Sequence, residues 1–404
     1  MKTRISMLHN LCVWRGGAER LIFSLSSELK RLGYDVNVYV LRYNPTKCYP
    51  EFREIKTAGA SRLFGLRIFD AMPALQALEL ALRAPSCDII HAHNFPANIA
   101  ALMATRLNRG CANIPYLWQC NEPSRIIYDR DEVRRYRKEA ESLSLLRRTT
   151  ALLGLRMMHT TSRSLDMCAA RNASVVTTLS RFVARIVKET YGRDAIVLNP
   201  GVDVRIFHPS VDGKTVRRRY GIAEAPLLLT VSRLWPAKNV ETALEAFRIV
   251  LEDYPSAFYL VVGDGPSARD LQNLAYKLGL GQRVRFVPDD EVENLAEFYA
   301  ACDIFVFPAL GEPWGLSVLE AMASGKPVVA ANDGGLPEII TDRRNGILVE
   351  PRNPHSYAEA IQCLLDSQSL ATTLGERAAN TAKTHTWERM ARSYSKIYDQ
   401  LLQS

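Results

Sequence analysis

Short apolar segments alternate with amphipathic segments along the whole chain. Runs rich in Val, Ile and Leu are separated by longer stretches with helical periodicity, and the same order is repeated in the second half. This alternation is typical of βα units stacked around parallel sheets. The segments expected to form strands are 4–9, 35–41, 88–93, 114–118, 173–179 and 195–199, then 226–234, 258–263, 283–288, 303–308, 327–332 and 346–350.

The turn-rich segment Asn199–Asp203 separates the two series of strands. Its Pro and Gly residues interrupt both periodicities, so we expect two domains, residues 1–200 and 201–386. A last helix of about 387–404 could pack back on the first domain. Ligands of doubly wound sheets bind outside the carboxyl ends of the strands. The pattern therefore predicts an α/β fold of two doubly wound Rossmann-like domains with a cleft between them.

The composition is that of an ordinary globular protein. The chain has 404 residues, of which 47% are hydrophobic and 23% charged, and this balance excludes a disordered protein. No apolar run reaches the ~18 residues of a membrane span, and the first residues lack the features of a signal peptide. The eight cysteines form no C-x-x-C pair. We therefore expect a cytoplasmic protein with reduced thiols, no structural zinc and an unused sequon at Asn172.

Charge is distributed unequally along the chain. Residues 1–200 carry 30 Lys and Arg against 17 Asp and Glu, although the net charge of the whole chain is only +8. The two halves are therefore expected to have different partners. The basic half shows no aromatic-interleaved basic strand and no recognition-helix pattern, which argues against nucleic acid. An anionic membrane surface, bound peripherally, fits the basic half better.

Two loops carry groups that suit an anionic ligand. Gly16 and Gly17 stand where the first strand turns into a helix, so their backbone N–H groups can approach a phosphate. Arg233 and Lys238 follow a strand of the second half, just before a helix. Two cations beside a helix N-terminus suit a diphosphate. The alternatives are a tight turn in the first case and a solvated loop in the second.

A third glycine-rich segment, Gly263–Ala268, fits the dinucleotide fingerprint G-x-G-x-x-A. It follows an apolar run, and Asp289 and Asp290 lie about 20 residues further on, as the fingerprint requires. However, it belongs to the second βα unit of its domain, and Pro266 occupies the turn. A dehydrogenase therefore remains an alternative on this pattern alone.

A pair of carboxylates follows the apolar run 303–308. Seven residues separate Glu312 from Glu320, and in a continuous helix the two would lie ~12 Å apart along the axis. A retaining hydrolase needs its carboxyl groups only about 5–5.5 Å apart, so these two should contact different parts of a long ligand. Between them, the N–H groups of Leu316 and Ser317 open a helix and suit an anion. The alternative is one helix-capping acid and one surface acid.

Together these motifs resemble those of family 4 of the retaining glycosyltransferases, which have the GT-B fold of two facing Rossmann-like domains. The resemblance covers nearly the whole chain, through RGGAERL, TVSRLWPAKN, VVGDGP, EPWGLSVLEAMASGKPVVA and GGLPEII. It implies transfer of a sugar from a GDP- or UDP-linked donor to a hydroxyl acceptor, without a metal or other cofactor. Such enzymes act in the synthesis of polysaccharides, lipid-linked oligosaccharides or glycolipids, so a carbohydrate or glycolipid acceptor is expected.

The resemblance also implies roles for single residues. Glu320 would hold the ribose of the nucleotide and Glu312 would face the sugar ring. It further implies that Gly263–Pro266 is a structural turn. The groups expected to neutralise the diphosphate are Arg233, Lys238 and the backbone of Gly16 and Gly17.

One position departs from the family pattern. In the segment Trp118–Pro123, Asn121 stands where the W-x-C-H-E-P variant of the family has His. Asn can hydrogen-bond a sugar hydroxyl but cannot act as a general base. In the internal-return mechanism proposed for the family, the departing phosphate accepts the proton, so Asn is tolerable. His93, at the end of a nearby strand, is a candidate for orienting a ligand; the alternative is a packed histidine, and a metal site lacks further ligands.

A highly charged segment, Arg125–Arg148, contains Asp129 and Asp131 in the D-x-D form of a metal motif. It does not follow a clear strand, so we interpret it as a solvated helix face. With the adjoining apolar segment Ala151–Leu155, it is also a candidate contact with a membrane on the acceptor side.

The sequence thus predicts a metal-independent, retaining glycosyltransferase whose second domain binds the donor and whose first domain binds the acceptor. The alternatives are a GT-B epimerase or phosphorylase acting on related substrates, a non-catalytic protein that binds sugar nucleotides, and the dehydrogenase.

Overall fold

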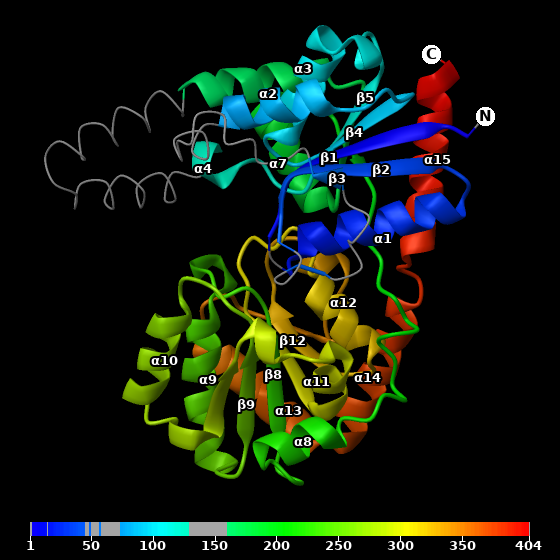
Figure 1. Cartoon of the computed structure of the whole chain (residues 1–404). Helices are drawn as coiled ribbons and strands as arrows, with labels where there is room; N and C mark the ends of the chain where they lie inside the picture. Colours follow the sequence, from blue (N-terminus) through cyan, green and yellow to red (C-terminus); the bar gives the residue numbers. More distant parts are fainter. Residues whose placement is uncertain are drawn as a thin grey trace, which may run out of the picture. The chain divides into compact units, whose positions relative to one another are not determined.

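The structure, a computed structural model, describes residues 2–13, 15–44, 48–49, 56–57, 73–128 and 160–403. It divides the chain into two compact units (Figure 1). Unit 1 comprises Met1–Leu198 together with Met390–Ser404, and unit 2 comprises Asn199–Arg389. The chain therefore passes from unit 1 through all of unit 2 and then returns to unit 1.

Unit 1 is built on a seven-stranded sheet in which every recorded pairing of neighbours is parallel. The order β3-β2-β1-β4-β5-β6-β7 reverses direction between β1 and β4. The last helix, α15, completes this unit. The elements are β1 (Arg4–Cys12), α1 (Gly17–Arg31), β2 (Asp35–Tyr43), β3 (Lys56–Thr57), α2 (Pro73–Arg83), β4 (Ile89–His93), α3 (Ala97–Leu107), β5 (Tyr116–Cys120), α4 (Arg125–Tyr128), β6 (Val175–Thr178), α7 (Arg181–Tyr191), β7 (Ile196–Val197) and α15 (Trp387–Gln403).

The two faces of this sheet differ in chemistry. One face packs its apolar side chains, such as Ile90 and Trp118, against α2, α3 and α7 in one continuous core. The other face carries a row of buried polar side chains, because His93, Gln119 and Thr177 are paired in register on β4, β5 and β6. Helix α15 covers this row and supplies hydrogen-bonding partners for it. The contacts are Tyr398 with His91, at 2.7 Å, and Tyr394 with Thr177, at 3.1 Å, and with Gln119.

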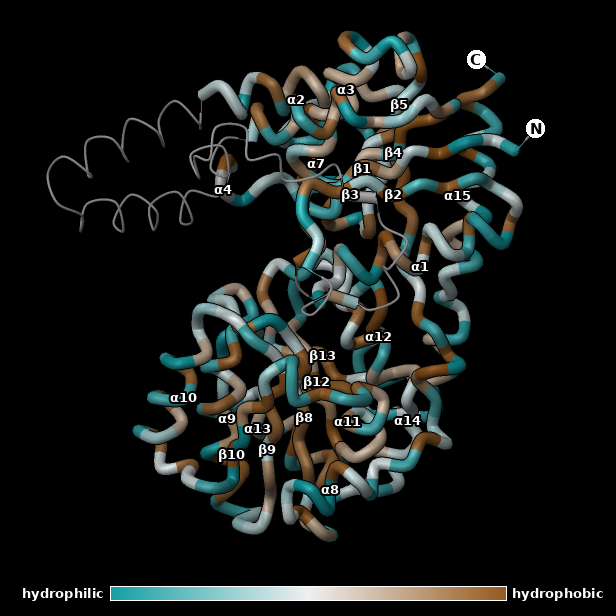
Figure 2. The backbone as a smooth tube through the Cα atoms, in the orientation of Figure 1, coloured by the Kyte–Doolittle hydropathy of each residue, from teal (hydrophilic) through white to brown (hydrophobic). Residues whose placement is uncertain are grey.

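Unit 2 is a six-stranded parallel sheet of order β10-β9-β8-β11-β12-β13, which reverses direction between β8 and β11. Its strands are short and almost wholly buried, and the centre of the unit is hydrophobic (Figure 2). The elements are α8 (Lys214–Tyr220), β8 (Leu227–Val231), α9 (Val240–Asp253), β9 (Phe258–Val262), α10 (Ala268–Lys277), β10 (Val284–Val287), α11 (Leu295–Ala301), β11 (Ile304–Phe307), α12 (Leu316–Ala323), β12 (Val328–Ala331), β13 (Ile347–Val349), α13 (Pro354–Asp366) and α14 (Gln368–Ala382).

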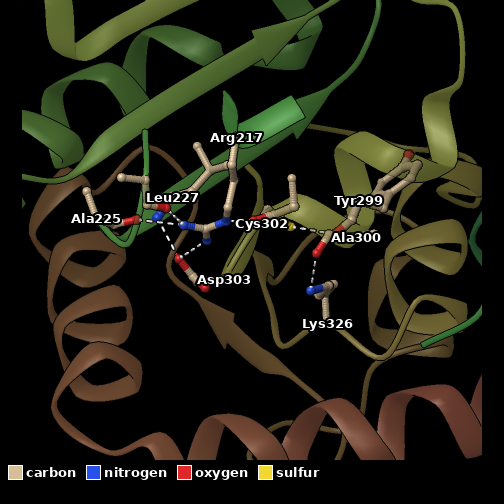
Figure 3. Close-up of polar contacts among 10 residues, drawn as sticks. Arg217, Ala225, Leu227, Tyr299, Ala300, Cys302, Asp303 and Lys326 are labelled. Carbon is tan, nitrogen blue, oxygen red and sulfur yellow. Dashed lines mark hydrogen bonds and ion pairs between the residues drawn. The ribbon is translucent and has the colours of Figure 1, made fainter. Parts of the chain in front are cut away.

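A polar network holds the amino ends of β8 and β11 together (Figure 3). The guanidinium of Arg217 donates to the carbonyl of Ala301 at 2.9 Å and to the Asp303 carboxylate at 2.8 Å. The same carboxylate accepts the N–H of Leu227 at 2.7 Å. Cations that bind the last carbonyls of a helix stabilise its C-terminus. The network thus fixes the end of α11 at the edge of the sheet opposite the carboxyl ends of the strands.

Each of the twelve predicted strands overlaps a strand of the structure, and the predicted α/β class is confirmed. The sequence reasoning missed β3, which has only two residues. Among the described residues, no helix is both long and apolar enough to cross a membrane. The part of the charged segment that follows Tyr128, with Asp129 and Asp131, lies outside the described residues. The apolar segment Ala151–Leu155 lies outside them as well.

Candidate functional site

The candidate site of unit 2 lies where its sheet reverses direction. Arg233 and Lys238 follow β8, and Glu312 follows β11, its neighbour in the sheet. Parallel strands place their carboxyl ends at one edge, and such a switch point is the usual ligand site of an open α/β sheet. The structure thus brings these three predicted residues to the same edge of unit 2.

Lys238 and Glu312 form an ion pair. The Lys238 Nζ atom lies 2.5 Å from Glu312 Oε2, and the two side chains retain 25% and 13% of their exposure. Nζ also lies 5.7 Å from the centre of the Phe307 ring. The pair is therefore only partly shielded from solvent. Its two charges lie at the carboxyl ends of β8 and β11, where they are accessible to a ligand.

The loop that carries Lys238 is fixed by its own backbone and by one buried amide. Asn239, in the left-handed region with φ of 51°, is buried and donates from Nδ2 to the carbonyl of Pro308 at 3.1 Å. The N–H of Leu310 donates to the carbonyl of Ala237 at 2.8 Å. These bonds join the loop after β8 to the loop after β11, so Lys238 and Glu312 are presented as one preorganised surface.

A third loop, after β12, holds the backbone around Glu312 by hydrogen bonds. Asp333 accepts the N–H of Gly311 at 2.9 Å, and the N–H of Gly335 donates to the carbonyl of Glu312 at 2.8 Å. Gly334 has φ of 64°, and a Cβ atom there would lie 2.5 Å from the carbonyl oxygen of Glu312. Sequence reasoning assigned this loop no role. The signal that could have found it is Asp-Gly-Gly directly after an apolar strand.

Helix α12 begins at Leu316, after the N-cap residue Gly315. The N–H groups of Leu316 and Ser317 stand in its first turn, where backbone donors have no partner within the helix. Glu320 lies one turn further along and is half-buried. Its Oε2 atom accepts a hydrogen bond of 2.8 Å from the hydroxyl of Tyr299 on α11. Sequence reasoning did not identify Tyr299 as part of the site.

The glycine-rich turn after β9 packs against the backbone of the loop after β8. The N–H of Leu234 donates to the carbonyl of Asp264 at 2.8 Å, and that of Ser267 to the carbonyl of Leu234 at 2.9 Å. Gly263 has φ of 129°, and a Cβ atom there would lie 2.0 Å from the carbonyl oxygen of Ser232. These glycines are therefore needed for close packing beside Arg233, as expected of a structural turn.

In unit 1, the predicted glycine loop lies at the corresponding switch point, after β1. Gly16 is the N-cap residue of α1, and Gly17 is its first residue. The carbonyl of Gly16 accepts the N–H of Arg20 at 3.0 Å and the hydroxyl of Tyr49 at 3.4 Å. The Arg20 guanidinium stacks over the Tyr49 ring at 4.1 Å. The first turn of α1 carries this cation and also a buried carboxylate, Glu19, so it is the N–H groups at the helix N-terminus that suit an anion.

Asn121 lies just after β5 in unit 1 and is almost buried. Its Oδ1 atom accepts a hydrogen bond of 3.0 Å from the amide of Gln119, and its N–H donates to Asn94 Oδ1 at 3.0 Å. Gln119 is oriented in turn because its Oε1 atom accepts from Thr177 and Tyr394. Gln119 uses one of the two acceptor sites of Asn121 Oδ1, and the NH₂ group of Asn121, which only donates, can be offered to a ligand.

His93 ends β4 as predicted, but its side chain is fully buried. It stacks on His91 with ring centres 4.1 Å apart, and neither of its ring nitrogens has a hydrogen-bond partner among the described residues. Burial lowers the pKa of His91 to about 3 and that of His9 to about 4. Burial, and then the proximity of His91 and His9, holds the pKa of His93 well below 6.5. All three are therefore neutral, and the side chain of His93 has no exposed surface.

Within the described residues, no group of three or more His, Cys, Asp or Glu side chains is arranged to hold a metal ion. At the switch-point edge of unit 2, the groups that could offer positive charge or N–H donors to an anionic ligand are Arg233, Lys238 and the start of α12. Groups of these kinds recognise phosphate by charge and by hydrogen bonds.

The two parallel sheets, each with candidate ligand groups at its switch point, define the GT-B class of α/β proteins. Solved structures agree over almost the whole length. Anabaena HepE in complex with UDP and glucose matches with a TM-score of 0.77 and 20% identity, covering 98% of this chain and all of that one. Sucrose-phosphate synthase from Thermosynechococcus elongatus matches with a TM-score of 0.75 and 22% identity, covering 99% of each chain.

Family models then place the chain more narrowly. The model of glycosyltransferase family 4 matches residues 15–206, and that of the group 1 glycosyl transferases matches residues 213–381. The chain belongs to family 4 of the glycosyltransferases, as the sequence motifs indicated. A D-inositol 3-phosphate glycosyltransferase of Geodermatophilus obscurus is 40% identical over 228 residues, covering 53% of this chain and 50% of that protein. The chain spans about half the length of the curated relatives it matches.

Proposed function

We propose that the protein is a retaining, metal-independent glycosyltransferase that moves a sugar from a GDP- or UDP-linked donor to a hydroxyl acceptor. The observation that carries this proposal is the surface formed by Lys238, Glu312 and the start of α12 at the switch point of unit 2. This surface combines the charge of Lys238 with the carboxylate of Glu312, and a second carboxylate, Glu320, lies one turn into α12.

In the proposed reaction, the bond between the anomeric carbon and the diphosphate breaks, and negative charge develops on the leaving phosphate. Arg233, Lys238 and the N–H groups of Leu316 and Ser317 would stabilise that charge. Preorganised donors of this kind are typically worth ~3–4 kcal/mol each. Because Lys238 and its loop are already held by hydrogen bonds, little reorganisation is needed when charge develops.

The carboxylates have separate roles in this proposal. Glu312, in the loop beside Lys238, would face the sugar ring, and Glu320, one turn into α12, would accept hydrogen bonds from the ribose. The departing phosphate would accept the proton of the acceptor hydroxyl, so no protein base is required. Asn121 suits this arrangement because its free NH₂ group can donate to an acceptor or sugar oxygen but cannot take a proton.

UDP is the first nucleotide to test because HepE was solved with UDP, with UDP and glucose, and with UDP-glucose. The acceptor is proposed to be a carbohydrate or glycolipid that binds to unit 1. The excess of Lys and Arg in residues 1–200 supports a peripheral contact with an anionic membrane surface at the cytoplasmic face.

The testing experiment is a thermal-shift panel of UDP, GDP, ADP, NAD and the corresponding sugar nucleotides, first without added metal and then with a chelator. A ligand at 100 times its dissociation constant should add ~2.7 kcal/mol to the free energy of unfolding. We expect one nucleoside diphosphate to stabilise the protein, with no loss of the effect in chelator. Stabilisation by NAD alone would refute the proposal and favour a dehydrogenase.

A matched pair of variants ties binding to the site. Lys238→Ala should abolish most of the stabilisation by the nucleotide, whereas Lys277→Ala, on the exposed end of α10, should leave it intact. The nucleotide that binds is then supplied as its sugar conjugate and followed by NMR. Change of the donor without an acceptor would indicate an epimerase, dependence on free phosphate a phosphorylase, and binding without turnover a non-catalytic protein.

A further inference from the structure

The hydrogen bond between Tyr299 and Glu320 is a contact of the proposed donor site that has no role in the proposed reaction. The Tyr299 hydroxyl lies 2.8 Å from Glu320 Oε2, and the tyrosine has no exposed surface. We propose that Tyr299 is a positioning residue that holds the Glu320 carboxylate in the orientation that recognises the ribose of the donor. This inference rests on the proposed function, because it concerns the same nucleotide.

The ring of Tyr299 is itself held firmly. It contacts Phe207 edge-on, with ring centres 5.6 Å apart, and Phe305 at 5.5 Å. Aromatic rings packed in this way have few alternative rotamers in a close-packed interior. The hydroxyl is therefore presented from a fixed point of the core.

The backbone that carries Tyr299 is fixed as well. The carbonyl of Ala300 accepts a hydrogen bond of 2.7 Å from Lys326, and that of Ala301 accepts one of 2.9 Å from Arg217 (Figure 3). Lys326 comes just after α12, the helix of Glu320. Helices α11 and α12 are therefore joined at two points, by Lys326 with Ala300 and by Tyr299 with Glu320.

Such support matters because a glutamate side chain on a helix surface has three rotatable bonds. Binding must otherwise pay for freezing these bonds when the ligand arrives. An ionised carboxylate accepts hydrogen bonds only. The tyrosine hydroxyl donates to Oε2 of Glu320 and thereby restricts the rotation of the carboxylate, so that its other acceptor sites keep one orientation. Ribose hydroxyls are donors that such a preoriented carboxylate recognises.

The test compares Tyr299→Phe with a matched control, Tyr259→Phe. Tyr259 is also buried in unit 2, and its hydroxyl shares a hydrogen bond of 2.7 Å with Thr230, away from Glu320. Each variant loses one buried phenolic hydroxyl, so both should lose similar thermal stability. The probes are UDP and GDP and their 2′,3′-dideoxy analogues, with dissociation constants measured by calorimetry on the full chain.

We expect Tyr299→Phe to weaken binding of the ribonucleotide about tenfold, the size of effect expected from one charge-assisted hydrogen bond. The dideoxy analogue, which lacks the ribose donors, should bind both proteins equally, and Tyr259→Phe should change neither affinity. In a Glu320→Ala background, Tyr299→Phe should have no further effect. With the sugar nucleotide as substrate, the change should fall on KM rather than kcat.

Two outcomes distinguish failure of the proposed function from failure of the role of Tyr299. If the wild-type protein binds neither UDP nor GDP, the proposed function fails and the role of Tyr299 fails with it. If the wild-type protein binds one of them but Tyr299→Phe weakens the ribonucleotide and the dideoxy analogue equally, or neither, then only the positioning role is overturned.

Discussion

Acid should destabilise unit 1 selectively because of its three buried histidines. The pKa values of His9 and His91 are lowered to about 4 and about 3, and that of His93 also lies well below 6.5. In the unfolded chain all three take up a proton near pH 6.5, whereas in the folded chain they do not. Folding stability falls wherever the unfolded state binds more protons. It should therefore fall as the pH drops from about 6.5 toward the folded pKa values.

The size of the effect follows from the pKa values. Between pH 7.5 and pH 5, His9 and His91 each lose the protonation free energy of about 1.5 pH units, or ~2 kcal/mol at 1.36 kcal/mol per unit. Together these two groups would remove up to ~4 kcal/mol, a large part of the 5–15 kcal/mol typical of a domain, and His93 acts in the same direction. Buried Asp166 acts in the opposite sense, because burial raises its pKa and the folded state then takes up its proton first.

Hydrogen exchange followed by mass spectrometry can resolve the two units, with rates corrected for the intrinsic effect of pH. We expect the opening free energy of peptides from β4–β6 and α15 to fall by several kcal/mol between pH 7.5 and pH 5. Peptides from β8–β12 serve as the internal control. Burial lowers the pKa of His385 in unit 2 as well, so a smaller fall is expected there.

A single variant checks the cause. His91→Gln removes one titrating group while keeping a partner for the Tyr398 hydroxyl, so the acid-induced loss in unit 1 should shrink by ~2 kcal/mol. Equal losses in the two units, or an unchanged loss in His91→Gln, would refute the reasoning.

Two further predictions concern the donor site. Glu320→Ala should raise the KM for the donor at least tenfold, and Glu312→Ala should mainly lower kcat, because a hydrogen bond to a charged group is typically worth ~1.5–3 kcal/mol. Steady-state kinetics would contradict the assignment if both effects were equal and small. Gly334→Ala and Gly221→Ala share a left-handed backbone, with φ of 64° and 65°, but only the first would meet Glu312. Gly221→Ala should lose ~1–2 kcal/mol of stability in denaturant titrations, and Gly334→Ala should lose more because its Cβ atom would overlap the backbone of Glu312. Only Gly334→Ala should also lower kcat; equal activities would argue against the supporting role of the loop.

Much of the architecture could be predicted because its signals are local. Apolar runs such as 303–308 are strands in the structure, and helices begin close to Ala18 and Leu316 as their flanking glycines indicated. The order of βα units also places Arg233 and Glu312 after strands of one sheet. Family membership followed from the same motifs and is confirmed by the family models.

The pairings could not be predicted, because they join residues that are distant in sequence. Lys238 and Glu312 are 74 positions apart, and Tyr394 is 275 positions from Gln119. No periodicity reveals such contacts. His93 was expected to orient a ligand, yet it is buried in a polar row whose cover, α15, comes from the end of the chain. Tyr299 belongs to no pattern that stands out in a single sequence, whereas Asp333 opens an Asp-Gly-Gly turn to which the sequence reasoning assigned no role.

The return of α15 to unit 1 has a consequence for synthesis on the ribosome. The polar row on β4, β5 and β6 lacks its hydrogen-bonding partners until the tyrosines of α15 are synthesised. All of Asn199–Arg389 must be synthesised before them. At ~5–20 residues per second, this delay is roughly 10–40 s. Unit 2 is continuous in sequence, so it can complete its fold before the unit that precedes it. Any truncation or stalled translation near the carboxyl terminus should therefore leave the first-made half of the protein unfinished.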